Sequence, residues 1–162
     1  MTDSSSSLDR PQPTSSDKPQ PMACFDPAKF ELKLSVTLSA DRNAVDPVVR
    51  SVMDVVRDTR CAPGREDDVE LALAEALANA VVHGAKNDAS KIVECDVACN
   101  DQGAILIVVR DPGPGFDPTT IADPCVGENI YSHHGRGIFL INQLMDEVRF
   151  HKNGTEIHMI KR

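Results

Sequence analysis

The segment from Glu66 to His83 constrains the fold more than any other part of this chain. From Leu71 to Val82 its residues are apolar on nearly every side of a helix, and a helix of that kind has to be buried by other elements. Glu75 and Asn79 interrupt it four residues apart, so they share one face, and His83 continues the row. Because burying an unsatisfied polar group is costly, Glu75 and Asn79 need partners. Either both bond to nearby backbone, or they form a carboxylate base beside an amide oxygen that can bind a metal ion.

The hydrophobic pattern around this helix predicts a layered α/β fold. Alternating apolar residues predict a strand over 30–38, and an unbroken apolar run predicts a central strand over 104–110. The other expected elements are a helix over 43–58, a strand over 91–99, a helix over 136–145, and a hairpin of 147–151 and 155–160. A mixed sheet with helices on one face, an α/β two-layer sandwich, fits this order. The irregular segment over 112–134 has the length of a functional or disordered loop.

Composition divides the chain into a tail and one domain. Residues 1–28 are rich in Ser and Pro and have almost no apolar side chains before Met22, so we expect a disordered tail there. The folded domain is expected over 29–162. A net charge of −8 argues against direct nucleic-acid binding, which needs a basic face. No apolar run is long enough to span a membrane, and we see no signal peptide, so we expect no membrane partner.

The five cysteines are scattered and show no CxxC spacing. This pattern predicts neither a disulfide framework nor a zinc site. Cys95 and Cys99 are expected on one face of the strand over 91–99, where both would pack in the core. A reducing cytoplasm fits this interpretation.

Two glycine-containing motifs lie on either side of the long loop. Asp111-Pro112-Gly113-Pro114-Gly115-Phe116 begins at the carboxyl end of the central strand, where α/β sheets commonly bind ligands. Gly113 and Gly115 allow close backbone approach. Gly135-Arg136-Gly137 opens the helix over 136–145, where backbone amides can bind phosphate. Each motif alone is also consistent with an ordinary tight loop or a glycine-rich helix start.

The order of the three features resembles the GHKL ATPase superfamily, which has the Bergerat ATP-binding fold. Glu70–Gly84 resembles the N box of the bacterial anti-sigma-factor serine/threonine kinases, Asp111–Pro118 their G1 box and Gly135–Ile141 their G2 box. The resemblance covers roughly residues 30–162 and includes the ending Gly154–Arg162. It implies a histidine-kinase-like ATPase domain with a mixed, mostly antiparallel sheet and helices on one face.

The resemblance also implies roles for single residues. Glu75 would be the general base on the substrate hydroxyl, Asn79 would reach Mg²⁺, and Asp111 would accept a hydrogen bond from the adenine amino group of ATP. Gly113 and Gly115 would let the backbone pass the nucleotide, and the segment after them would be the ATP lid. Gly135 and Gly137 would present amides to the phosphates. Arg136 would offset phosphate charge, and Thr155 would join the adenine contacts.

In the family, such a kinase binds a sigma factor, phosphorylates a STAS-type anti-anti-sigma protein, and is commonly a homodimer. The resemblance therefore implies a cytoplasmic partner-switching regulator of transcription. The alternative is an interaction module that sequesters a partner without phosphoryl transfer. The catalytic domain of a two-component histidine kinase ranks lower, because no dimerising helix with a phosphoacceptor His precedes the domain in this sequence.

Overall fold

Within the part of the chain that the structure describes, the strands pair into one five-stranded sheet in the order β1-β2-β3-β5-β4. The computed structural model describes residues 26–120 and 133–162. The strands are β1 (Glu31–Ser39), β2 (Ile92–Cys99), β3 (Ile105–Arg110), β4 (Glu147–His151) and β5 (Glu156–Lys161). Each of the four pairings is antiparallel, so the sheet is antiparallel rather than mixed. Residues 1–25 of the predicted tail and 121–132 of the long loop lie outside the described residues.

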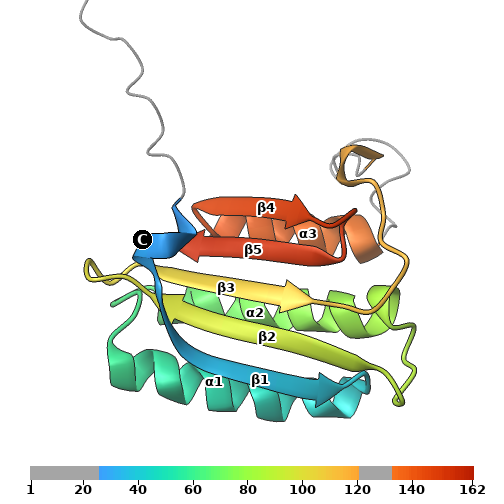
Figure 1. Cartoon of the computed structure of the whole chain (residues 1–162), viewed down its shortest axis with the longest axis horizontal. Helices are drawn as coiled ribbons and strands as arrows, with labels where there is room; N and C mark the ends of the chain where they lie inside the picture. The colour runs from blue at the N-terminus through green and yellow to red at the C-terminus, as the bar shows by residue number, and fades with distance from the viewer. Residues whose placement is uncertain (1–25, 121–132) are drawn as a thin grey trace, which may run out of the picture.

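Three helices cover one face of this sheet (Figure 1). They are α1 (Val45–Thr59), α2 (Glu66–Asn79) and α3 (His133–Leu144), and the short turns are η1 (Pro27–Lys29), η2 (Arg42–Ala44), η3 (Ala80–Gly84) and η4 (Pro118–Thr120). The expected two-layer sandwich is confirmed. The helix expected from residue 43 begins instead with η2, whose first turn the Asp41 side chain caps by accepting from the Asn43 amide at 2.9 Å.

The main core lies between the sheet and the helices. Each helix contributes an apolar stripe, which in α1 consists of Val45, Val49, Val52, Met53 and Val56. The inward-facing residues of β2 and β3 complete the core. The all-round apolar sequence of α2 predicts burial on every side, but only the face with Val69, Ala72, Leu73, Ala76 and Leu77 is buried. Leu71, on another side, is 44% exposed. A smaller cluster of Ala98, Leu106, Val108 and Ile160 packs with Phe30 apart from this core.

The end of α2 departs from a regular helix. The sequence predicts an α-helix as far as His83, whereas Ala80–Gly84 form a π-helical turn. In it the Ala85 amide donates to the Ala80 carbonyl at 2.8 Å, and the Asn87 amide donates to the Val81 carbonyl at 2.9 Å. The wider turn carries Gly84 directly against Asp111, so close that a Cβ at Gly84 would overlap the carboxylate. Packing against the end of β3 therefore decides how this helix ends.

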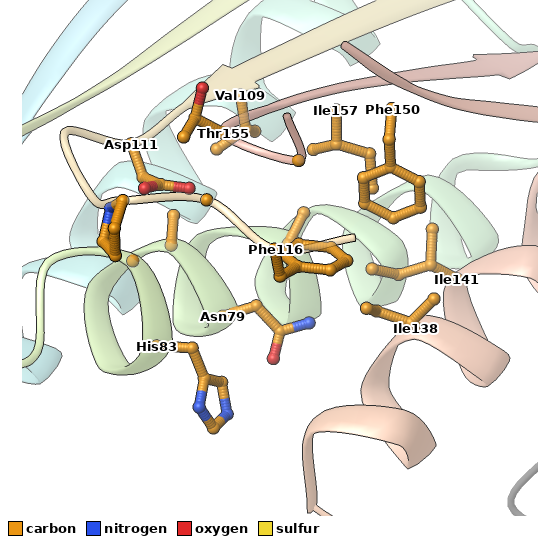
Figure 2. A pocket seen from close by; sticks show the side chains of 16 residues that line it. Asn79, His83, Val109, Asp111, Phe116, Ile138, Ile141, Phe150, Thr155 and Ile157 are labelled. Carbon is orange, nitrogen blue, oxygen red and sulfur yellow. The ribbon is translucent and has the colours of Figure 1, made fainter. Parts of the chain in front are cut away.

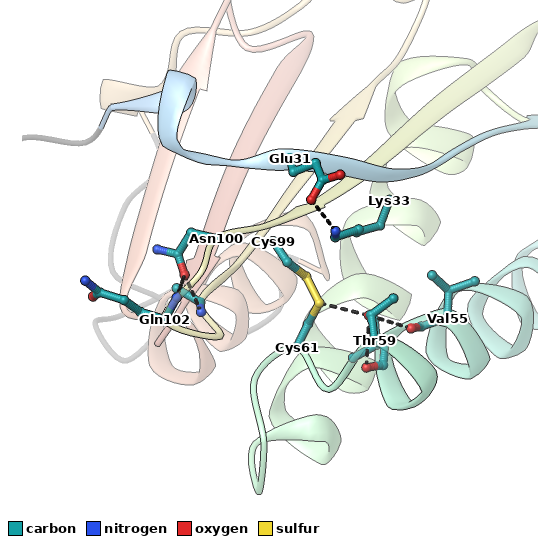
Figure 3. The surroundings of a disulfide bond; sticks show 10 residues. Glu31, Lys33, Val55, Thr59, Cys61, Cys99, Asn100 and Gln102 are labelled. Atoms are coloured by element: carbon teal, nitrogen blue, oxygen red, sulfur yellow. Dashed lines mark hydrogen bonds and ion pairs between the residues drawn. A yellow bond between two sulfur atoms is a disulfide. The ribbon is translucent and has the colours of Figure 1, made fainter.

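The prediction that the cysteines form no disulfide is wrong at one pair. Cys61, in the loop between α1 and α2, is bonded to Cys99 at the end of β2, with Cα atoms 6.1 Å apart (Figure 3). The bond joins residues 38 apart in the sequence, so no local sequence pattern predicts it. Cys95 is a free, buried core residue, as expected. The cysteines therefore no longer support a reducing compartment.

Candidate functional site

A cavity of about 180 Å³ opens between α2, α3, the end of β3 and the β4–β5 hairpin (Figure 2). Its walls are mostly apolar and include Ala76, Ala80, Val109, Pro114, Phe116, Ile138, Ile141, Phe150 and Ile157. The polar side chains in its lining are Asn79, His83, Asp111 and Thr155. An apolar cavity with a few convergent polar groups is the usual form of a small-molecule site.

Asp111 stands at the carboxyl end of β3, where the sequence predicts a ligand. Its amide donates to the Thr155 carbonyl at 2.9 Å, and its Oδ1 accepts from the Gly113 amide at 2.8 Å. Burial raises the pKa of Asp111, and the Gly113 hydrogen bond only partly offsets this effect. A half-buried carboxylate of this kind favours a hydrogen-bond donor that can replace the water it has lost.

The glycines of the first motif hold this loop close to its neighbours. A Cβ at Gly113 would overlap the Gly84 carbonyl, and one at Gly115 would overlap the Asn153 carbonyl. Gly115 also has a positive φ of 79°, which a residue with a side chain rarely adopts. Both glycines therefore allow close approach between backbone segments, and their approach to a nucleotide stays a prediction.

Phe116 is a residue of the cavity wall whose role was not predicted. Its amide donates to the Asn153 carbonyl at 2.8 Å, and its ring meets the ring of Phe150 edge-on, with centroids 5.4 Å apart. Asn79 and Ile138 line the same cavity, and Figure 2 shows the Phe116 ring near both of them. The motif includes Phe116, but only the tertiary structure shows that the ring lies in the wall.

Glu75 and Asn79 share one face of α2, as predicted, and the first turn of α3 packs against them. A Cβ at Gly137 would lie 2.9 Å from Glu75 Oε2 and 3.1 Å from Asn79 Nδ2, so a side chain there would displace both groups. Asn79 lines the main cavity, and together with Glu75 it also lines a second hollow beside Asp46 and His83. Among the described residues, no backbone hydrogen bond satisfies either side chain.

The second glycine motif lies inside a helix rather than before it. The sequence predicts the helix from Arg136, but α3 begins at His133, so Gly135, Arg136 and Gly137 belong to its first turns. Packing of α3 against α2 outweighs the low helix propensity of two glycines. Gly135 and Gly137 are buried, whereas Arg136 is exposed and outside the cavity lining.

The structure thus brings most of the predicted residues together. Asn79, Asp111, Gly115 and Thr155 line the cavity, and Gly113 adjoins it through Asp111. Glu75 and Gly137 meet beside Asn79. Sequence reasoning missed the apolar wall, especially Ile138, Ile141 and Phe150. Their apolar character gave a signal for burial, but none for burial at this cavity.

Comparison with known proteins finds a matching family and several similar curated proteins. The family described as the histidine kinase-like ATPase domain matches residues 38–161. The serine-protein kinase RsbW of Staphylococcus epidermidis is 36% identical over 104 residues, which are 59% of this chain and 64% of that protein. RsbW of Bacillus cereus is 29% identical over 143 residues, 82% of this chain and 86% of that protein. The anti-sigma F factor of Priestia megaterium is 24% identical over 103 residues, 58% of this chain and 67% of that protein.

A solved structure shares the fold. It contains the RsbU and RsbW domains of a Mycobacterium tuberculosis protein and aligns with a TM-score of 0.55 at 19% sequence identity, covering 79% of this chain and 31% of that one. The predicted resemblance to the anti-sigma-factor serine kinase branch is confirmed by the names of the relatives. The match over residues 38–161 shows that the chain belongs to the histidine kinase-like ATPase domain family.

Proposed function

We propose that this chain is an ATP-dependent serine/threonine protein kinase and anti-sigma factor of a partner-switching system. The arrangement of one site carries the proposal. Asp111, the proposed acceptor for adenine, and Glu75, the proposed general base, stand on either side of Asn79. Asp111 lies at the cavity and Glu75 at the neighbouring hollow, and Asn79 lines both spaces.

The cavity fits the adenine base at Asp111. The Asp111 carboxylate is half-buried among apolar walls and accepts a hydrogen bond from only one described group, the Gly113 amide. The exocyclic amino group of adenine would supply a further donor, and the apolar walls suit the faces of the ring. Thr155 lies beside this position, with its hydroxyl donating to the Lys152 carbonyl at 2.8 Å.

Asn79 and the start of α3 suit the phosphates and Mg²⁺. Magnesium commonly keeps several waters and takes one or two protein ligands besides the phosphates, so a single amide oxygen is a sufficient protein ligand. Within the described ranges, no group of three His, Cys, Asp or Glu side chains is arranged to hold a metal ion. Bound Mg²⁺ would neutralise charge on the phosphates during transfer. Gly137 leaves room beside Asn79 that a side chain would fill.

Glu75 is the proposed acceptor of the proton of a substrate hydroxyl. Its carboxylate lies by Gly137 Cα and lines the second hollow, whose wall includes Arg42, Asp46 and His83. A seryl or threonyl hydroxyl that enters from this hollow would meet Glu75 before it reaches the cavity. Phosphoryl transfer depends on positioning and charge stabilisation, so one correctly placed carboxylate suffices as the base.

The names of the relatives, serine-protein kinase RsbW and anti-sigma F factor, support the proposed partners. The proposed substrate is a STAS-type anti-anti-sigma protein, the proposed sequestered partner is a sigma factor, and we propose a homodimer in the cytoplasm. No helix formed by residues 26–120 and 133–162 is both long and apolar enough to cross a membrane. The alternative function, an interaction module without transfer, predicts partner binding with no role for Glu75.

Calorimetric titration with ATP and Mg²⁺ tests the proposal on three proteins. Wild type is expected to bind, Asp111→Asn to lose binding because an amide offers the wrong group to adenine, and Glu75→Ala to keep binding. Phosphate transfer from labelled ATP to a panel of recombinant STAS-domain proteins is expected for wild type alone. Transfer by Glu75→Ala would contradict the general-base role. Binding without any transfer would favour the interaction module.

A further inference from the structure

We infer that Arg110 and Glu156 are positioning residues for the base-binding end of the cavity, although neither side chain lines it. The inference rests on the proposed function. Arg110 on β3 and Glu156 on β5 stand opposite each other. Each is next in the sequence to a residue that lines the cavity. Asp111 follows Arg110, and Thr155 precedes Glu156.

Glu156 is the centre of an ion-pair cluster that spans the sheet. Its Oε2 accepts from Arg110 Nε at 2.9 Å and from Lys152 Nζ at 2.7 Å, and its Oε1 lies 2.7 Å from His158 Nε2. Arg110 Nη1 reaches across to Asp96 Oδ2 at 2.5 Å on β2. The cluster therefore ties β2, β3 and β5 together at the end of the sheet where the cavity opens.

The cluster holds both sides of the base-binding end. Through Arg110 it fixes the last residue of β3, from which the chain runs directly into Asp111. The Asp111 amide then donates to the Thr155 carbonyl at 2.9 Å, one residue beyond the ion pair. A shift of β3 against β5 would break the Arg110–Glu156 pair and would move Asp111 relative to Thr155 by the same amount.

Through Lys152 the cluster also fixes the turn that carries the cavity wall. Lys152, Asn153 and Gly154 have positive φ values of 50°, 56° and 82°, an uncommon run that the surrounding structure must hold in place. The Lys152 side chain does so from within the turn by pairing with Glu156. The carbonyl of Asn153 accepts the Phe116 amide at 2.8 Å, so the position of this turn sets the position of Phe116.

Glu156 acts as a fixed negative charge. Its side chain is 9% exposed. Burial raises the pKa of this carboxyl, but hydrogen bonds from Lys152, His158 and Arg110 outweigh burial and hold the pKa at about 2. Glu156 therefore stays ionised at any pH at which a kinase works, and its contribution is geometric rather than a proton transfer.

The test compares Glu156→Gln with Glu147→Gln as a matched control. Glu147 is equally buried, with a side chain 9% exposed, and accepts from Arg149 Nη2 at 3.2 Å and from Arg162 Nη2. It begins β4, where it pairs with Ile160 at the opposite end of the sheet from Asp111. Both variants keep the shape of the side chain and remove its charge, so we expect both to lower the midpoint of thermal unfolding.

Only Glu156→Gln is expected to change nucleotide binding. Calorimetry with Mg²⁺ should give an ATP affinity about tenfold weaker than wild type, because small misplacements of binding groups are costly. The preference for ATP over GTP should fall as well, since GTP lacks the amino group that Asp111 is proposed to recognise. Glu147→Gln should match wild type in both. A general loss of stability would not change the preference between two nucleotides.

Two results would overturn the inference. Glu156→Gln could bind ATP as Glu147→Gln does, or it could bind ATP and GTP more weakly by the same factor. If Glu156→Gln is unfolded at the assay temperature, Lys152→Met replaces it, because the Lys152 side chain is 68% exposed and its loss spares the core. Unchanged ATP affinity in Lys152→Met then contradicts the inference. If the wild type binds no ATP, the proposed function itself is contradicted. If the wild type binds ATP and Glu156→Gln binds it equally well, only the positioning role is contradicted.

Discussion

Gly137 shows how a residue without a side chain can define a site. In an ordinary helix, replacement of glycine by alanine is favourable by about 0.5–1 kcal/mol. At Gly137 the new Cβ would lie 2.9 Å from Glu75 Oε2, which is the far end of a flexible side chain. The fold can therefore absorb the methyl group, but only by moving this carboxylate, which is proposed to act as the base, together with the Asn79 amide 3.1 Å from the Cβ.

Gly137→Ala is accordingly expected to change the free energy of unfolding by no more than about 1 kcal/mol and to lower the transfer rate about 100-fold. Denaturant unfolding and transfer from labelled ATP measure the two effects. Gly84→Ala is the contrasting variant, because its Cβ would overlap the Asp111 carboxylate and should remove ATP binding instead. An unchanged transfer rate in Gly137→Ala would show that the position of Glu75 is not critical.

At the scale of elements, the Cys61–Cys99 disulfide links the loop between α1 and α2 to the end of β2. Arg60 and Ala62, on either side of Cys61, have positive φ values of 53° and 49°, so the loop adopts a conformation that other contacts must hold. The Ala62 amide donates to the Gly103 carbonyl at 2.7 Å and adds a second link. The disulfide therefore ties the start of α2, the helix that carries Glu75 and Asn79, to the sheet.

Reduction of this bond should lower stability. In the loop-entropy model, a cross-link between residues 38 apart raises the free energy of the unfolded state by about 4 kcal/mol. For a chain of this size, the midpoint of thermal unfolding should then fall by about 10 °C in a strong dithiol reductant. The double variant Cys61→Ala/Cys99→Ala serves as the control and should not respond to the reductant. An equal response of both proteins would show that the bond contributes nothing.

At the scale of the whole molecule, acid stability depends on buried carboxylates. The pKa of Glu156 is held at about 2, below the ordinary value of 4.5. The pKa of Asp96 is also lowered, because hydrogen bonds from Ser35 and Arg110 outweigh its burial. A carboxyl whose pKa is lowered on folding stabilises the protein fully above its unfolded pKa, and this stabilisation is lost as the pH falls through the folded value.

The free energy of unfolding should therefore decline between about pH 4.5 and pH 2. Glu156→Gln should be less stable than wild type at neutral pH and should lose less stability over this interval, because it has no charge to lose there. Denaturant unfolding at a series of pH values measures both curves. Parallel curves for the two proteins would contradict the assignment of this acid dependence to Glu156.

The sequence by itself determined the order of the elements and the positions of the three motifs. Periodicity records which side of a segment is buried, so it predicts a helix such as α1 and a strand such as β1 from neighbouring residues alone. It also predicts that Glu75 and Asn79 share a face, because that depends only on helical geometry. These features are local, and a local pattern is sufficient to specify them.

Only the tertiary structure decided which distant residues meet. The sheet order β1-β2-β3-β5-β4 inserts β5 between β3 and β4, and this insertion places Glu156 beside Arg110. Packing between separate elements likewise decides three other features. They are the Cys61–Cys99 bond, the π-helical turn that packs against Asp111, and the place of Phe116 in the cavity wall. The physical reason is the same for all of these contacts. Each one joins residues that are far apart in the sequence and that come together only when the sheet and the helix layer form. Hydrophobic periodicity along the chain therefore does not encode these contacts.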